Sequence, residues 1–215
     1  MTRKFSRADS LVHRFDAALR TLVPGAAPAS RASPASREVR DSPMDAEERR
    51  HAAGLVRIHH AGALGAQALY QGQGLTAGLS ERRGREEEAA RDEAGQHLAW
   101  CDARLDELND RTSRLTPFIY IASFGLGAAA GVAGHRVSLG MAAATEEQLG
   151  KLLDQHLERL PRGDQRSRAV LCQMRIDEAH HVQLALEAGA VRFPGAVKAG
   201  MSLMTNAMAC SVYRL

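Results

Sequence analysis

The chain has 215 residues, 45% of them hydrophobic, and a formal net charge of +3. This length suits one domain with a real core, and an odd count of three cysteines argues against a disulfide framework. Arginines are scattered among acids and aromatic residues make up only 4%, so nucleic acid is not an expected partner.

The first predicted element is a short basic amphipathic helix. In "DSLVHRFDAALRTLV" apolar residues recur at helical spacing, with arginines elsewhere on the wheel. Such a helix can lie on an anionic membrane or dock on its own domain, and the sequence leaves both open. The apolar residues are Leu11, Val12, Phe15, Leu19 and Leu22.

Residues 24–43, "PGAAPASRASPASREVRDSP", are rich in Pro, Ala, Ser and Arg and have no apolar periodicity. Such a composition buries too little surface to order a chain, so we predict a disordered linker. We therefore divide the chain into an N-terminal part, residues 1–43, and a folded domain, residues 44–215.

From Met44 onward the pattern is helical, without the alternation typical of strands. Acids in "SPMDAEERRH" favour a helix start, and Asp164 is a predicted N-cap. Several long helices with short connections predict an all-α bundle. The predicted helices are 44–73, 78–110, 117–134, 138–160, 164–188 and 194–213.

The segment "TPFIYIASFGLGAAAGVAG", residues 116–134, carries no charge. Its length is near the lower limit for crossing a bilayer, and Gly127 and Gly131 are spaced as in closely packed helices. A buried central helix and a helix dipping into one leaflet fit the pattern as well as a full span does.

Two ionisable residues interrupt the apolar stripe of the helix predicted for 164–188. Glu178 and His181 are three residues apart and share a face with apolar neighbours, whereas Asp177 and His180 are expected to face water. The apolar neighbours are Leu171, Met174, Val182 and Ala185.

Glu146 occupies a similar apolar face on the preceding predicted helix, with Ala142, Leu149 and Leu153 around it. A buried carboxylate must be protonated, paired or bound to a cation, because an isolated buried charge is very unfavourable. Oxygen and imidazole ligands suit iron, manganese or zinc. Pairing of each acid with an arginine, and a hydrogen-bonded core histidine, are the alternatives.

A carboxylate-bridged metal site in a helix bundle uses Glu-x-x-His on two helices. The second candidate is "RDEAGQHLAWCDARL", which contains His97. The residue three positions before His97 is Ala94, and Glu93 stands four before it on the same helical face. Glu93 is therefore the candidate substitute for a missing ligand.

Four separated motifs together resemble the Coq7 family of demethoxyubiquinone hydroxylases. They are "RIHHAGALGAQALYQGQ", "HLAWCDARL", "SLGMAAATEEQLGKLLDQHLERLP" and "RIDEAHHVQLALEAGA". The resemblance covers most of residues 44–215 and implies a ferritin-like helical bundle with an additional membrane-contacting helix.

The resemblance also implies a set of metal ligands. His97, Glu146, Glu178 and His181 match the family's ligand positions, and two iron ions are expected on that basis. Ala63 and Ala94 stand where the family pattern has glutamate. Tyr70 is expected to be a core residue or a neighbour of the ligands, and His156 is expected to be exposed.

By resemblance the chain is expected to be an O₂-dependent monooxygenase that hydroxylates the ring of a polyprenyl demethoxy-ubiquinol in ubiquinone biosynthesis. The alternative is an impaired relative, lacking the carboxylates at Ala63 and Ala94, that acts as a quinone-binding scaffold. The family also implies a peripheral position on the cytoplasmic face of the bacterial inner membrane, with other ubiquinone-biosynthesis proteins as candidate partners.

Overall fold

The protein is described by a computed structural model covering residues 7–27, 29, 31–35, 38–75 and 83–215. The described residues contain helices and no strand, so the predicted all-α bundle is confirmed. The predicted start of the second core helix, residue 78, lies outside the described residues. The helices are α1 (Arg7–Leu22), α2 (Ala46–Gln73), α3 (Arg83–Glu107), α4 (Thr116–Ala133), α5 (His135–Arg159), α6 (Gln165–Glu187) and α7 (Gly195–Arg214).

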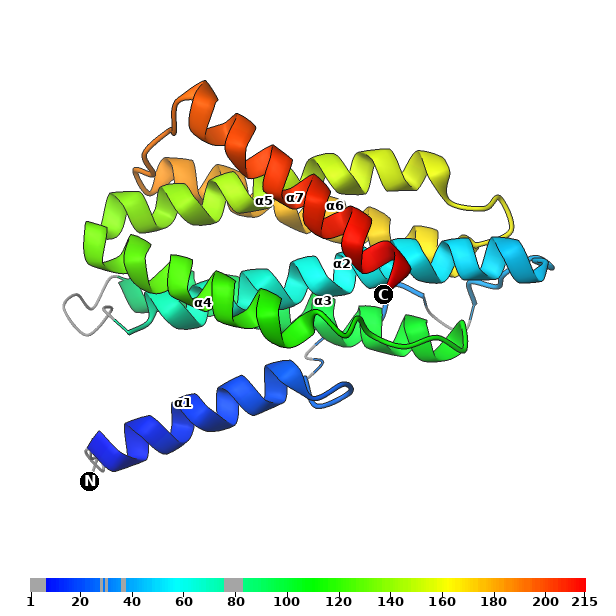
Figure 1. Cartoon of the computed structure of the whole chain (residues 1–215), viewed down its shortest axis with the longest axis horizontal. Coiled ribbons are helices and arrows are strands. Elements are labelled where there is room, and N and C mark those ends of the chain that lie inside the picture. Colours follow the sequence, from blue (N-terminus) through cyan, green and yellow to red (C-terminus); the bar gives the residue numbers. More distant parts are fainter. Residues whose placement is uncertain (1–6, 28, 30, 36–37, 76–82) are drawn as a thin grey trace.

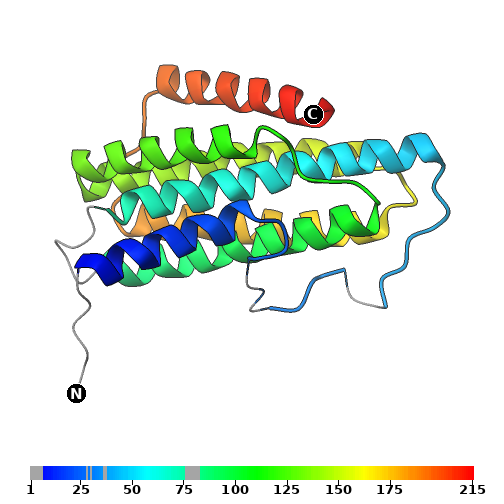
Figure 2. The same cartoon turned by 60° about the horizontal axis from the view of Figure 1, so that its bottom comes forward.

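The core of the bundle consists of two helix pairs. Helix α2 packs against α3, α5 packs against α6, and contacts between α3 and α6 and between α2 and α5 join the pairs. Helix α4 packs along α2, and α7 crosses the outside of the bundle, as Figures 1 and 2 show. This is the ferritin-like arrangement that the sequence predicts, in which facing helices direct side chains into one interior.

Local sequence explains where the helices begin and end. Asp45 caps α2 in a capping box with Glu48, and Asp164 caps α6 by accepting from the Ser167 backbone N–H. Helix α3 ends three residues before the predicted boundary, and Asn109 just beyond it has a left-handed φ of 57°. Gly134, with φ of 114°, separates α4 from α5.

The small residues of α4 serve its close approach to α2. A Cβ added to Gly127 would lie 2.0 Å from the Leu69 carbonyl oxygen, and one added to Gly72 would lie 2.1 Å from that of Phe124. Only glycine lets the two backbones come this near. On the outward side of α4, Phe118, Ile121 and Val132 are exposed.

Among the described residues, α4 is the one helix long and apolar enough to cross a membrane by length and composition. Only 28% of the 18 residues of this helix are buried inside the structure. One such helix is weak evidence for a span, and its packing on α2 gives its glycines a role inside the bundle.

Helix α1 contacts α2 and α4, and Figure 2 shows it alongside α2. Ala18 and Leu22 pack against an apolar cluster of the domain, and the Gln71 side chain donates to Thr21 Oγ1 at 2.8 Å. Val12 and Phe15 remain exposed, at 68% and 66%. The helix therefore docks on its own domain and still presents an apolar face outward.

The described residues between α1 and α2 make specific contacts with the bundle, although their composition predicts disorder. The Gly25 N–H donates to Asp102 Oδ2 at 2.9 Å, and Asp41 pairs with the buried Arg104 at 2.7 Å. Composition gives no sign of such contacts, because backbone groups and single charged side chains make them.

Candidate metal centre

Three helices bring the predicted ligand residues together in the interior. His97 lies on α3, Glu146 on α5, and Glu178 and His181 on α6, and all four are buried. Ligand atoms of Glu146, Glu178 and His181 lie within 4.8 Å of one another. His97 Nδ1 is 3.4 Å from Glu178 Oε1. The helical faces inferred from the sequence therefore converge.

Glu146 is the most informative member of this group. The Tyr70 hydroxyl donates to Glu146 Oε1, and His181 Nδ1 lies 3.5 Å from the same oxygen. Glu146 Oε2 is buried and has no hydrogen-bond partner among the described residues. Buried polar atoms are nearly always partnered, so this oxygen suits a bound cation. Burial also raises the pKa of the Glu146 carboxyl, although its hydrogen bonds oppose that rise.

The described residues place no arginine against Glu146 or Glu178, whose ion-pair partners are His181 and His97. This weighs against the alternative in which each acid is neutralised by its own arginine. Two carboxylates and two imidazoles match the donor types that suit iron, manganese or zinc, so the residues present fit such a metal.

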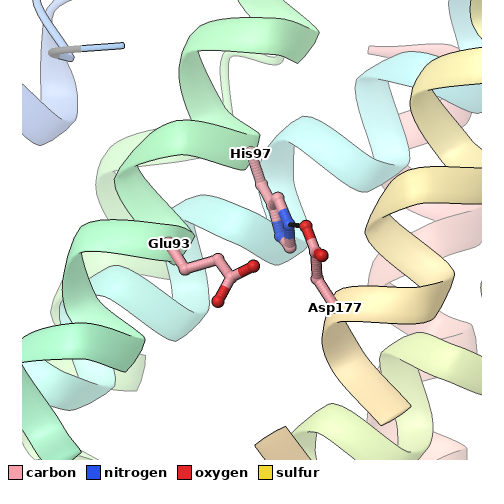
Figure 3. Close-up of side chains that lie close together, drawn as sticks. All are labelled: Glu93, His97 and Asp177. Carbon is pink, nitrogen blue, oxygen red and sulfur yellow. Dashed lines mark hydrogen bonds and ion pairs between the residues drawn. The ribbon is translucent and has the colours of Figure 1, made fainter. Parts of the chain in front are cut away.

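Two further carboxylates lie on the outer side of the imidazoles, in a crossed arrangement between α3 and α6. Asp177 on α6 is 3.0 Å from Nε2 of His97 on α3. Glu93 on α3 is 2.5 Å from Nε2 of His181 on α6. Each imidazole therefore has a carboxylate at Nε2, and its Nδ1 faces Glu178 or Glu146. Figure 3 shows the Asp177 carboxylate against the His97 ring.

This arrangement is the usual one for histidine ligands, which donate one ring N–H to a carboxylate and bind metal through the other nitrogen. The expectation that Asp177 faces water is wrong, because its carboxylate is buried between α3 and α6. His180 is exposed as expected. Helical spacing alone missed Asp177, because the residue next to Glu178 falls outside the apolar stripe and only the partner helix gives it a role.

The charges of the group explain its protonation. Burial lowers the pKa of His181, but hydrogen bonds and charges from Glu146 and Glu93 outweigh burial and raise it to about 10. Burial raises the pKa of the Asp177 carboxyl, and hydrogen bonds from His97, Arg31 and Gln173 reverse this and leave it well below its usual value. Asp177 is therefore an ionised acceptor for His97 Nε2–H.

Glu93, the candidate substitute ligand, forms a second group with His97 and Asp177 whose ligand atoms lie within 4.8 Å of one another (Figure 3). A cation already contacts that group, because Arg31 Nη2 is 2.8 Å from Glu93 Oε1 and 2.6 Å from Asp177 Oδ2. The geometry therefore favours Glu93 as the hydrogen-bond partner of His181. Its direct metal binding stays a prediction.

The two alanines that the resemblance places at ligand positions lie in apolar surroundings. Ala63 belongs to a cluster with Leu64 and Leu98, and Ala94 belongs to one with Tyr70 and Leu149. Neither position offers an oxygen to a metal. The candidate ligands are thus the carboxylates of Glu146 and Glu178 and the imidazoles of His97 and His181.

His156 is not exposed as expected but buried, with its Nδ1 2.9 Å from Nε2 of His59. The sequence placed it on a helix but could not show that α2 covers it. Tyr70, expected to be a core residue or a neighbour of the ligands, is both buried and hydrogen-bonded to Glu146.

Comparison with known proteins agrees with these motifs. Residues 50–211 match the family model described as "Ubiquinone biosynthesis protein COQ7". The chain is 60% identical to a 3-demethoxyubiquinol 3-hydroxylase from Chromohalobacter salexigens, with full coverage of both chains. It is 53% identical to the protein of that name from Azotobacter vinelandii, over 99% of this chain and 98% of the relative.

Proposed function

Because the chain belongs to the COQ7 family of ubiquinone biosynthesis proteins, we propose that it is a 3-demethoxyubiquinol 3-hydroxylase. Similar proteins carrying this name align along the whole chain, which supports a monooxygenase acting on a quinol substrate with O₂. One oxygen atom enters the ring C–H bond. The other leaves as water, which requires two protons and a two-electron reductant.

We propose iron as the cofactor, held by His97, Glu146, Glu178 and His181. The observation that carries this assignment is the buried Glu146 Oε2, which has no hydrogen-bond partner in the described part of the chain and lies beside two other ligand-type side chains. Bound ferrous iron would supply the O₂ activation that side chains cannot provide. The expectation of two ions rests on family resemblance alone. This chain offers two carboxylates fewer than the family pattern, because Ala63 and Ala94 stand where that pattern has glutamate.

The side chains around these ligands have separate roles in the proposed reaction. Tyr70 donates to Glu146 and fixes that carboxylate. Asp177 and Glu93 hold the Nε2 atoms of His97 and His181, so that both Nδ1 atoms point inward. The apolar cluster that contains Leu69, Ala142 and Leu149 keeps bulk water away from this interior.

We propose that the protein meets its polyprenyl substrate at the cytoplasmic face of the bacterial inner membrane. The exposed apolar residues of neighbouring helices α1 and α4 support this position, notably Phe15 on α1 and Phe118 and Ile121 on α4. Contact with one leaflet accounts for these residues without requiring a full span, and it would let a lipid-soluble quinol enter the bundle directly.

The alternative, a catalytically impaired scaffold that binds quinone, is not favoured. The similar proteins that cover the whole chain are named as hydroxylases. The buried Glu146 Oε2, which has no hydrogen-bond partner among the described residues, also has a use in a metal enzyme and none in a scaffold.

Rescue of a bacterial strain lacking its own hydroxylase tests the proposal. We expect the wild-type chain to restore ubiquinone and Glu178→Ala to leave the demethoxy precursor, both measured by mass spectrometry of extracted lipids. Glu158→Ala, an exposed acid on α5, is the matched control and should rescue fully. Failure of the wild-type chain to restore ubiquinone would contradict the enzymatic role, and rescue by Glu178→Ala at equal protein level would contradict the role of Glu178 in the metal centre.

A further inference from the structure

Arg31 lies at the outer side of the metal centre, although it belongs to the non-helical stretch between α1 and α2. Its Nη2 donates to Glu93 Oε1 at 2.8 Å and to Asp177 Oδ2 at 2.6 Å. Glu93 is on α3 and Asp177 is on α6, so one guanidinium links the two helices that carry His97 and His181.

The bundle holds the backbone of Arg31 through a buried side chain. Gln96, only 1% exposed, accepts from the Arg31 N–H through Oε1 at 2.6 Å and donates to the Arg31 carbonyl through Nε2 at 3.0 Å. A side-chain amide that uses both ends on one residue fixes that residue's position and orientation.

Trp100 also contacts the Arg31 side chain. The guanidinium carbon lies 5.0 Å from the centroid of the indole ring, within the range of cation–π attraction. Gln96 and Trp100 precede and follow His97 on α3, so the residues that hold Arg31 flank a candidate ligand. Arg31 is the only residue of the described chain between α1 and α2 that contacts both outer carboxylates.

Arg31 contacts both carboxylates, and Gln173 additionally donates to the other oxygen of Asp177 at 2.8 Å. Glu93 uses one oxygen for Arg31 and the other for His181, and Asp177 Oδ2 accepts from both Arg31 and His97. Without the guanidinium, two negative groups would face each other and turn apart. The imidazoles that they hold would then lose their fixed direction.

We propose that Arg31 is a positioning residue of the metal centre, which locks Glu93 and Asp177 in place so that His181 and His97 point Nδ1 at the metal. The inference rests on the metal centre proposed above. Arg31 also occupies the group of Glu93, His97 and Asp177 with its own positive charge. A metal is thereby directed to the group of Glu146, Glu178 and His181.

The test is anaerobic titration of the full chain with Co²⁺, whose visible absorption reports coordination geometry. Arg31→Gln removes the charge, and Arg31→Lys keeps the charge but loses the planar guanidinium that lies over the Trp100 ring. We expect Arg31→Gln to weaken binding about tenfold to a hundredfold and to change the absorption spectrum. Arg31→Lys should fall in between, and it provides the comparison if Arg31→Gln does not fold.

Arg175→Gln is the matched control, because Arg175 on α6 pairs with Asp154 at 2.6 Å at the surface. It should bind Co²⁺ like the wild type with the same spectrum. Wild-type affinity and spectrum in Arg31→Gln would overturn the positioning role and leave the metal centre standing. Failure of the folded wild type to bind Co²⁺ would overturn the metal centre itself.

Discussion

Asp177 Oδ2 lies 3.0 Å from Nε2 of His97, across the boundary between α6 and α3. Because Asp177 directly precedes Glu178, one turn of α6 supplies both a candidate ligand and the acceptor that orients a ligand on another helix. The tautomer of His97 that binds metal through Nδ1 is thus favoured by a residue that does not touch the metal.

Asp177→Asn tests this relationship. The amide has no net charge, so its hydrogen bond to His97 Nε2–H becomes weaker and the ion pair with Arg31 is lost. We expect metal affinity to fall about tenfold to a hundredfold, measured by anaerobic Fe²⁺ or Co²⁺ titration. Asp154→Asn, which changes a surface acid paired with Arg175, is the control. Equal affinities in both variants would contradict the role of Asp177.

Placing glutamate at positions 63 and 94, where the family resemblance implies a carboxylate, should increase metal binding. In Ala63→Glu/Ala94→Glu, two acids enter apolar clusters beside the ligand helices. The metal-free variant should be less stable than the wild type, because uncompensated buried carboxylates are unfavourable, and each kcal/mol lost lowers Tm by roughly 2–4 °C. Added iron should bind in higher stoichiometry than in the wild type and recover the lost Tm.

The control for this double substitution is Ala209→Glu, which buries a carboxylate in a cluster of α7 away from the ligands. It should lose stability and gain nothing from iron. If Ala63→Glu/Ala94→Glu also fails to bind additional iron or to recover Tm, those positions do not face the metal centre.

The sequence predicted the helices and the inward residues well, because both follow from local patterns. Glu178 and His181 stand out against their apolar neighbours on a single helix, and no knowledge of the partner helices is needed. The same reasoning found Glu146, whose burial is confirmed. Their convergence required the tertiary structure, and their metal binding stays a prediction.

The sequence could not predict contacts that depend on the register between helices. Arg31 sits in a stretch with the composition of a disordered linker, and only the positions of Gln96 and Trp100 on α3 show where it docks. Likewise, the burial of His156 depends on α2 lying over α5, which no periodicity within α5 reveals.

The buried pair of His59 and His156 predicts acid sensitivity of the fold. Burial lowers the pKa of His156 to about 4 and lowers that of His59 well below its ordinary value. Between pH 6.5 and about 4 the unfolded chain therefore binds protons at these residues that the folded chain does not bind. The free energy of unfolding should decrease as pH falls through this window.

The variant His156→Gln isolates this contribution. For His156 the loss should reach roughly 3 kcal/mol across the window, so the variant should show a shallower decrease of unfolding free energy. Urea unfolding at a series of pH values measures it. His13→Gln, an exposed residue of α1, should keep the wild-type slope. A wild-type slope in His156→Gln would show that the pair does not control acid stability.

The outward apolar residues of α1 and α4 predict membrane binding. Phe15 is 66% exposed and Phe118 is 72% exposed, and neither contributes its full surface to the core. Burial of a phenylalanine side chain in an apolar phase is worth about 1.5–3 kcal/mol, so Phe15→Ser/Phe118→Ser should weaken binding at least about tenfold. Flotation with vesicles of phosphatidylglycerol and phosphatidylethanolamine measures the bound fraction.

Ile176→Ser is the control, because Ile176 is 62% exposed on α6 and lies outside the proposed membrane face. It should bind vesicles like the wild type. That result would distinguish binding through α1 and α4 from nonspecific binding through any exposed apolar residue. Since the metal ligands are untouched, Phe15→Ser/Phe118→Ser should retain wild-type Co²⁺ affinity while losing vesicle binding. Equal vesicle binding by both variants would remove α1 and α4 from the membrane contact and require another route for the polyprenyl substrate.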